Sequence, residues 1–343
     1  MVLVIILLAT TVSFVFTPLI TIVNTLFLPF LISGFLYFLS CPVVDWLERA
    51  RVPRWASILL LYLGAFAIIF LLVMLAGSPL QREVERLVND TPEMVDQLQE
   101  VLVSLQANPL IVRIIPEEAQ TIDQLSQSIT GLVGNLFSMV FDNFAAIFTV
   151  AADIMIGLLI VPFALFYLLK DGRSWRCSLS PHLPENWREE VETTLTEIGE
   201  GIASYIRGMF LVGVSVGTLL LIGYSIIGLD YALVLALFAA LTNVIPFLGP
   251  ILGSIPAVIV ALLHSPLMIL KVIGVVILVQ QVESLLISPQ VMGKQLSVGP
   301  LTVLLLILVA GRVAGFLGMI LILPAFVIVK IVAINAIGAL RNG

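Results

Sequence analysis

Uninterrupted apolar runs are the feature that most constrains how this chain folds. A run of about 18 apolar residues indicates a helix that spans a bilayer. Runs of this kind lie near 2–16, 19–39, 56–77, 146–169 and 208–227, and a longer one over 232–340 is divided by Gly and Pro. They are too long for the strands of an outer-membrane barrel. Because lipid requires backbone hydrogen bonds to be satisfied within each segment, the sequence predicts an all-α, polytopic transmembrane helical bundle.

Composition argues against several other classes of protein. Of the 343 residues, 60% are hydrophobic and 11% are charged, whereas soluble domains carry about 25% charged residues. The net charge of −6 argues against a nucleic-acid partner, which requires basic patches. The two cysteines and two histidines share no motif, so we expect no disulfide, metal site or cofactor. The sequence contains no P-loop, Ser–His pair or His-Glu-x-x-His motif, so we expect no enzyme and assign no catalytic residue.

Basic residues orient the spans through the positive-inside rule. Three arginines lie between the second and third spans, and three basic residues follow the fourth: Arg49, Arg51 and Arg54, then Lys170, Arg173 and Arg176. Both loops are assigned to the cytoplasm. The segment 78–145 contains ten acidic residues against three arginines and is assigned to the outside. The protein is therefore expected in the plasma (inner) membrane with its N-terminus in the cytoplasm and 2–16 as a retained span.

Two amphipathic segments separate these spans. In 78–145 apolar residues recur at helical spacing, which predicts a helical layer at the outer face. Thr91-Pro92-Glu93 indicates the start of a helix there. Its apolar stripe is compatible with packing on the membrane domain, on a neighbouring subunit or on lipid. The segment 184–207 is acidic on its polar face, so we expect it to pack on protein along the inner surface and to turn into the span at 208.

Two interruptions in the last third of the chain carry the main functional prediction. The first, from Asn243 to Gly253, includes Pro246, Gly249 and Pro250. These residues disfavour a continuous helix and permit close backbone contact. Because the run 232–263 is longer than one span needs, it is predicted to form two half-helices, as a re-entrant hairpin or a strongly broken span.

The second interruption repeats part of the first, since 247–249 and 316–318 both read Phe-Leu-Gly and precede a proline. Paired interrupted helices indicate a binding site in transporters. The alternative is a pair of kinks that ease packing.

Glu283 lies within the apolar run 267–287. A charge at the centre of a spanning helix costs roughly 2.5–3.5 kcal/mol, so a bound cation, a proton, a basic partner or water must offset it. Gln280 and Ser284 share its helical face, Gln281 points further round, and Arg312 either pairs with Glu283 or faces a lipid headgroup. The alternative is a hydrogen-bond network that packs helices. The predicted solute or ion site comprises Glu283, Gln280, Gln281, Ser284, Asn243, Pro246, Gly249, Pro250, Gly253 and Arg312.

Several motifs together resemble the autoinducer-2 exporter family of membrane permeases. They are Tyr205-Ile206-Arg207-Gly208, 228–233, 243–256, Gln281-Val282-Glu283 with Pro289 and 292–294, and 311–318 with Pro324. The resemblance implies about eight spans, a homo-oligomer such as a pentamer, and transport. Some members of that family are linked with export of the quorum-sensing molecule autoinducer-2, and others with exchange of sodium or lithium for protons, so the resemblance implies an activity of one of these kinds. Met209 and Arg312 depart from the family pattern.

The leading hypothesis is a secondary transporter that exports a small polar, autoinducer-2-like solute by alternating access. The first alternative is a Na⁺(Li⁺)/H⁺ antiporter that uses Glu283, with a monovalent cation as its partner. The second is a non-transporting scaffold that acts through 78–145. The chain is divided into N-terminal spans (1–77), the outer segment (78–145), the fourth span with the inner helix (146–207) and a C-terminal transport core (208–343).

Overall fold

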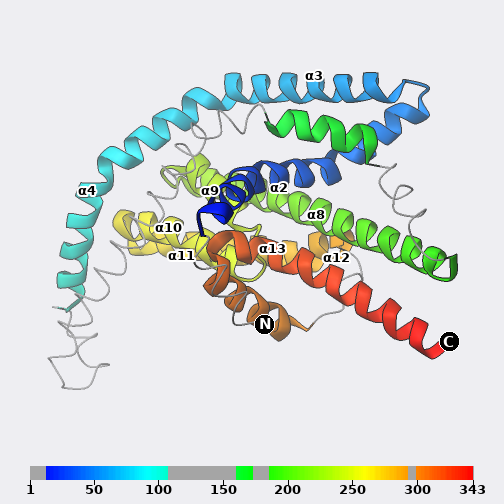
Figure 1. Ribbon diagram of the computed structural model, residues 1–343. Coiled ribbons are helices and arrows are strands. Elements are labelled where there is room, and N and C mark those ends of the chain that lie inside the picture. The colour runs from blue at the N-terminus through cyan, green and yellow to red at the C-terminus, as the bar shows by residue number, and fades with distance from the viewer. Residues whose placement is uncertain (1–12, 107–159, 173–184, 293–298, 343) are drawn as a thin grey trace. The chain divides into compact units, whose positions relative to one another are not determined.

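The computed structural model describes residues 13–106, 160–172, 185–292 and 299–342, and every regular element in these ranges is a helix (Figure 1). Within the described residues, two short apolar helices accompany five that are long and apolar enough to cross a bilayer, namely Thr25–Arg49, Arg54–Leu87, Arg188–Ile227, Pro266–Gln290 and Pro300–Ile337. The predicted all-α class is confirmed. The chain divides into two compact units, one of Met1–Phe66 with Phe148–Leu195 and one of Ala67–Ile147 with Thr196–Gly343.

The first unit packs helix α2 (Ser13–Arg49) and the start of α3 (Arg54–Leu72) on the helix 160–171. Arg54 Nε donates to the Leu169 carbonyl at 2.7 Å, and Arg54 Nη1 pairs with Glu48 at 2.8 Å. The Tyr62 hydroxyl donates to the Pro162 carbonyl at 2.6 Å. Arg54 therefore joins three helical segments as well as marking a predicted cytoplasmic loop.

The boundary predicted between the first two spans is wrong. Helix α2 runs without a break through Pro18 to Arg49. A proline removes one intrahelical hydrogen bond, and a membrane helix tolerates this where neighbouring groups satisfy the freed carbonyl. Residues 1–12 and 146–159 lie outside the described ranges, and with them most of the first predicted span and much of the fourth.

In the second unit, α3 continues through a π-helical turn, η1 (Val73–Gly77), into α4 (Ser78–Gln106). The helix start predicted at Thr91-Pro92-Glu93 is wrong, because α4 passes through it. Leu87 before Pro92 and Met94 after it belong to one apolar cluster with Val234, and such tertiary packing outweighs a local stop signal. Of the three alternatives for the apolar stripe, packing on its own chain is therefore observed for α4. The residues 107–145 lie outside the described ranges.

Helix α8 (Glu185–Ile227) is continuous over 43 residues, so the turn predicted at 208 is absent. It contains no proline, and near Glu197 and Gly201 it contacts helix α13 (Pro300–Asn342). A Cβ at Gly201 would lie 3.0 Å from Val327 Cγ1, and Asn335 Nδ2 donates to Glu197 at 2.8 Å. The prediction that this acidic helix packs on protein is confirmed, and this lateral packing explains why the helix continues straight.

Helices α9 (Ala232–Thr242) and α10 (Leu248–His264) form an antiparallel hairpin. Asp230 before α9 and His264 at the end of α10 meet at 3.3 Å, so the hairpin begins and ends at the same face of the unit. Its 11 and 17 residues extend about 16 and 26 Å, less than the roughly 30 Å of a bilayer core. The run 232–263 therefore folds back on itself, which is the geometry that the re-entrant alternative predicts.

The last two long helical segments are also irregular. Helix α11 (Pro266–Val282) passes through a π-helical turn, η3 (Glu283–Ile287), into α12 (Ser288–Met292). Helix α13 is interrupted where Ala314 and Gly315 leave the helical conformation. The second interruption expected from the sequence is therefore present.

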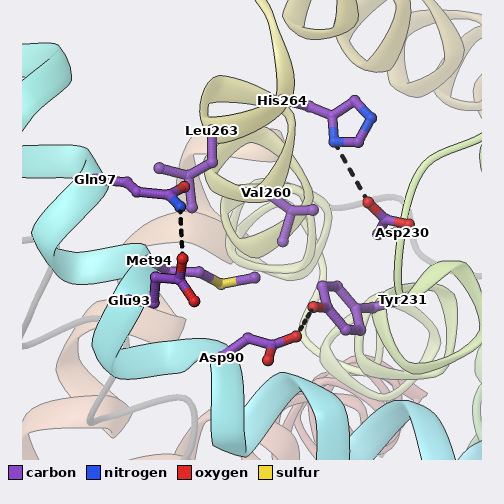
Figure 2. Close-up of a pocket in the computed structure, with 9 residues that line it drawn as sticks. All are labelled: Asp90, Glu93, Met94, Gln97, Asp230, Tyr231, Val260, Leu263 and His264. Carbon is purple, nitrogen blue, oxygen red and sulfur yellow. Dashed lines mark hydrogen bonds and ion pairs between the residues drawn. The ribbon is translucent and has the colours of Figure 1, made fainter.

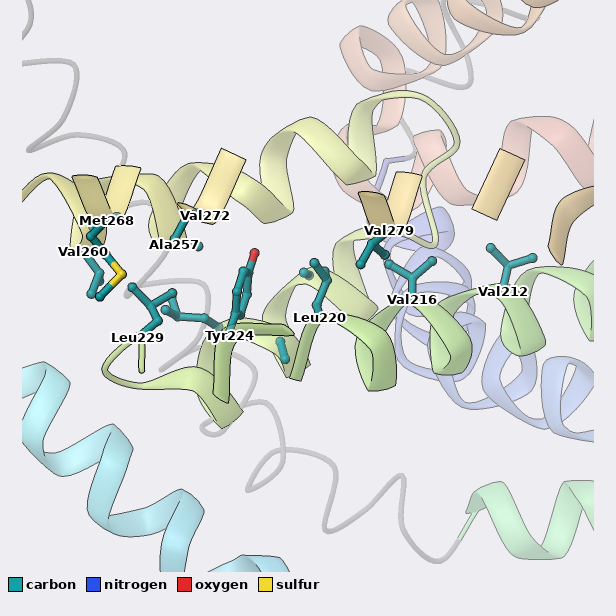
Figure 3. Close-up of a cluster of buried hydrophobic side chains, with 14 residues drawn as sticks. Val212, Val216, Leu220, Tyr224, Leu229, Ala257, Val260, Met268, Val272 and Val279 are labelled. Atoms are coloured by element: carbon teal, nitrogen blue, oxygen red, sulfur yellow. The ribbon is translucent and has the colours of Figure 1, made fainter. Parts of the chain in front are cut away.

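The core of the second unit lies where α8 packs on the hairpin and on α11 (Figure 3). Residues of α8 at helical spacing, including Val212, Val216, Leu220 and Tyr224, are buried there. Figure 3 shows the Tyr224 ring extending from α8 toward the side that carries Ala257 and Val272. This core packs on one side of the hairpin. Helix α4 contacts the hairpin near its open end, the end where Asp230 and His264 lie.

Candidate functional site

The tip of the α9–α10 hairpin is a strained turn centred on Phe247. The Leu248 N–H donates to the Pro246 carbonyl at 2.8 Å, which closes a three-residue γ-turn, and Phe247 has φ 64° and ψ −44°. A backbone of this kind costs a non-glycine residue on the order of 1–3 kcal/mol. The Phe247 side chain is 48% exposed, so its own packing does not explain the strain. Backbone strain of this kind concentrates at functional sites.

Two glycines bring the backbones of the two hairpin helices together. A Cβ at Gly249 would lie 2.7 Å from Asn243 Cα, and a Cβ at Gly253 would lie 2.6 Å from Thr242 Oγ1. Pro250 lies in the first turn of α10, where its missing N–H costs little because that group has no intrahelical partner. Pro246, Gly249, Pro250 and Gly253 thus shape the hairpin, and their contact with a solute stays a prediction.

Asn243 supplies a buried polar group at the same tip. It is 7% exposed, and its side-chain Nδ2 has no hydrogen-bond partner in the described part of the chain. The hydroxyls of Tyr205 and Tyr224, both on α8, are likewise buried and lack a partner there. An unsatisfied buried donor costs about 1–3 kcal/mol. Water or the oxygen of a bound molecule satisfies such groups.

The second interruption has a similar construction. Gly315 has φ 59°, and a Cβ at Gly318 would lie 2.9 Å from Ala314 Cβ, so the chain bends tightly there. Arg312, three residues before Gly315, is exposed. Arg312 and Glu283, both of which the structure describes, form no ion pair. The pairing proposed from the sequence is therefore not found, because the Arg312 side chain lies on the surface.

Glu283 is the first residue of the π-helical turn η3, in the last third of the helix Pro266–Gln290. Turns of this kind are frequent at functional sites. Gln280 Nε2 donates to Glu283 Oε2 at 3.1 Å, which confirms that the two side chains share a face. Ser284 Oγ instead donates to the Gln281 carbonyl at 3.3 Å. The carboxylate is thus held by Gln280 and half-exposed, while Ser284 bonds to its own helix.

The predicted site residues fall into three local groups: the hairpin tip, the Gln280–Ser284 face and the α13 interruption. Within the described ranges, no hydrogen bond or ion pair joins one group to another. Their convergence on a common solute site therefore stays a prediction. The same ranges hold no group of three or more His, Cys, Asp or Glu side chains placed to bind a metal ion.

Two cavities flank Tyr231 at the open end of the hairpin, and Figure 2 shows the smaller of them. Their volumes are about 210 and 650 Å³. The Tyr231 hydroxyl donates to Asp90 of α4, and His264 pairs with Asp230. Burial, and then the bond to Asp90, raise the pKa of the Tyr231 phenol, so this hydroxyl remains a donor at physiological pH. The acidic lining also includes Glu93 in the smaller cavity and Glu83 in the larger.

These residues at the open end were missed in the sequence. A usable signal existed, because Glu83, Leu87 and Asp90 are spaced i, i+4 and i+7 and so share one face of an amphipathic helix. The spacing does not reveal their partners. Leu233 and Val234 lie about 150 residues further along the chain and are brought to Glu83 only by the fold.

Comparison with known proteins covers almost the whole chain. The family model described as AI-2E family transporter matches residues 3–338. The Bacillus subtilis (strain 168) protein YueF, whose name assigns it provisionally to transport, is 39% identical over 99% of this chain and 92% of YueF. Escherichia coli (strain K12) PerM, provisionally named a permease, is 26% identical over 86% of this chain and 83% of PerM. A Halobacillus andaensis protein named sodium-lithium/proton antiporter is 20% identical over 82% of this chain and 81% of that protein.

Proposed function

Because this chain belongs to the AI-2E transporter family, we propose that it is a secondary transporter that moves a small polar solute across the plasma membrane by alternating access. The family match confirms the resemblance predicted from the sequence. The observation that carries the proposal is the buried Asn243 amide, which has no partner in the described part of the chain and lies at the strained tip of a re-entrant hairpin.

The chemistry of the hairpin tip supports a solute rich in oxygen atoms. Asn243 Nδ2 is a donor that a hydroxyl or carbonyl oxygen of the solute satisfies. Irregular backbone at membrane depth is tolerated where it is buried in protein or lines a water-filled cavity, and transporters place substrate sites at interrupted helices. In this proposal Glu283 accepts a hydrogen bond from a solute hydroxyl or holds the coupling ion, and Arg312 lies beside the second interruption.

An autoinducer-2-like molecule, exported in quorum sensing, is the solute class that we propose. Such a small polyhydroxylated furanone presents both oxygen acceptors for Asn243 and hydroxyl donors for Glu283. The proposal includes no enzymatic activity, cofactor or nucleic-acid partner. It places the N-terminus in the cytoplasm and the chain in a homo-oligomer within the lipid bilayer.

A Na⁺(Li⁺)/H⁺ antiporter is the second candidate, and Glu283 is the observation that favours it. A carboxylate held by only one amide in the described structure is suited to bind a proton and a monovalent cation in turn. The Halobacillus andaensis relative is named for that activity. The scaffold alternative has less support, because the stripe of α4 already packs on α9 and α10.

The test of the proposal is solute flux in proteoliposomes that contain purified protein. Asn243→Ala should reduce flux of a furanone polyol on the order of tenfold, as expected for one lost hydrogen bond of about 1–1.5 kcal/mol. It should not unfold the protein, because the amide has no partner in the described chain to lose. Ser254→Ala is the control, since its hydroxyl bonds to its own helix at Ile251. Equal flux in the two variants would reject the site.

Glu283→Gln separates the two candidate functions. For an antiporter, the substitution should abolish sodium-driven or lithium-driven proton movement, because an amide carries no exchangeable charge. For a polyol exporter, cation-driven proton movement should be absent in the unaltered protein. Antiport that survives in a folded Glu283→Gln protein would remove Glu283 from the mechanism.

A further inference from the structure

The N-terminus of α9 is capped by a residue of another helix. Tyr231 occupies the capping position with φ 58°, and its side chain makes no capping hydrogen bond. Instead, the N–H groups of Leu233 and Val234 both donate to Glu83 Oε2 of α4, each at 3.1 Å. A carboxylate in this position interacts favourably with the positive end of the helix dipole and satisfies two N–H groups that have no intrahelical partner.

Further contacts lie along the same face of α4. Leu87, one turn after Glu83, is 4% exposed and packs on Val234, which is also 4% exposed. Asp90, almost one turn further, accepts a hydrogen bond from the Tyr231 hydroxyl at the edge of the cavity shown in Figure 2. A polar, an apolar and a second polar contact therefore bind α4 to the residues where the hairpin begins.

We infer that Glu83 is a positioning residue for the re-entrant hairpin and that α4 and the α9–α10 hairpin move as one body. The inference rests on the proposed transport function, because it assigns α4 a part in the motion of the hairpin. If the hairpin separated from α4, two backbone donors and the Tyr231 hydroxyl would lose their acceptors together, and Leu87 and Val234 would be exposed. Helix α4 is then mechanically coupled to the hairpin that carries the proposed solute site.

Amide hydrogen exchange tests whether Glu83 positions the hairpin, and it does so without requiring transport. Glu83→Ala should accelerate exchange of residues 232–247 about five- to thirtyfold, the range expected for loss of a helix cap. Glu83→Gln should restore much of the protection, because its amide oxygen still accepts. Glu85→Ala is the matched control on the same helix, since Glu85 is exposed and accepts a hydrogen bond from Gln81, one turn before it on α4. Exchange in Glu83→Ala equal to that in Glu85→Ala would overturn the role of Glu83.

A disulfide tests whether α4 and the hairpin stay together during transport. In a protein whose Cys41 and Cys177 are replaced by Ser, Leu87→Cys and Val234→Cys would be oxidised to cross-link the two elements. Flux equal to that of the reduced protein would support motion as one body. Loss of flux that a reductant restores would overturn it and show that the hairpin leaves α4. Absence of flux in the unaltered protein would instead reject the proposed function, while the exchange result would still decide the role of Glu83.

Discussion

Phe247 and Asn243 stand four residues apart at the hairpin tip, and each is held in an unfavourable state. Phe247 has a backbone conformation that disfavours any side chain, and Asn243 buries a donor without a partner in the described chain. Neither state is explained by the residue itself, since the Phe247 ring is half-exposed and the hydrogen bonds of Asn243 to Ala239 and Leu241 come from its backbone N–H. A chain that needed only a tight turn here would be more stable with a glycine at 247. We therefore associate the cost with solute transport.

Phe247→Gly should stabilise the protein relative to Phe247→Ala by about 1 kcal/mol. Both variants remove the ring, but only glycine adopts a positive φ without strain of about 1–3 kcal/mol, and its greater freedom in the unfolded state offsets part of that gain. The thermal unfolding midpoint of detergent-solubilised protein measures the difference. Equal midpoints for the two variants would show that the turn at 247 is not strained.

At the scale of elements, the hairpin depends on contact between backbones rather than between side chains. Gly249 and Gly253 face Thr242, Asn243 and Ala239 at distances that leave no room for a methyl group. Gly318 has the same relation to Ala310 and Ala314 after the second interruption. Small residues allow such close packing in membranes, where apolar side chains gain nothing by leaving lipid. Both interrupted regions thus depend on glycines that allow close packing.

Gly249→Ala should destabilise the protein by about 1–3 kcal/mol, the usual cost of adding a methylene-sized group to a filled space. Its new Cβ would meet the Thr242 carbonyl and lie 2.7 Å from Asn243 Cα, both backbone atoms that cannot rotate away. Gly274→Ala is the control, because a Cβ there meets nothing within 4 Å and alanine favours a helix by up to about 1 kcal/mol. Thermal unfolding should therefore shift in opposite directions. A Gly249→Ala protein as stable as Gly274→Ala would contradict the close packing.

At the scale of the whole molecule, the positions of the two hairpin ends determine on which side of the membrane the later segments of the chain lie. The 3.3 Å contact between His264 Nδ1 and the Asp230 carboxyl group places both ends of 232–263 at one face. Helix α11 begins immediately afterwards at Pro266, so the span Pro266–Gln290 leads from that face to the other. A crossing at 232–263 would reverse the sides of every later segment. We therefore predict that 232–263 re-enters the membrane and that Pro266–Gln290 crosses it from that face.

Labelling of single cysteines from the two sides of the membrane tests this prediction. In a protein without native cysteines, Asp230→Cys and His264→Cys should react with an impermeant maleimide from the same side. Gln290→Cys, which is exposed at the far end of the span, should react only from the opposite side. The measurement is the fraction labelled in right-side-out and inside-out vesicles. Labelling of positions 230 and 264 from opposite sides would show that the hairpin crosses.

Local sequence predicted the helices and their interruptions well, but not where helices continue. Pro246 and Gly249 together predicted a break that the structure contains, because their backbone effects act at their own positions. Pro92 predicted a helix start that is absent, and the turn expected at 208 is also absent. In both cases a neighbouring helix supports the continuous one: Met94 packs with Leu87 against Val234, and α13 lies along Gly201. Local spacing contains no information about such a neighbour.

The sequence by itself determined that this protein is helical, that it lies in a membrane and that its last third is interrupted, because apolar length, Pro and Gly act locally. It also led to the family, through motifs that span most of the chain. Only the tertiary structure decided that 232–263 folds back as a hairpin and that Glu83 caps α9. Those outcomes depend on hydrogen bonds and ion pairs that join residues far apart in the sequence or across a turn, and the fold alone brings such groups within bonding distance.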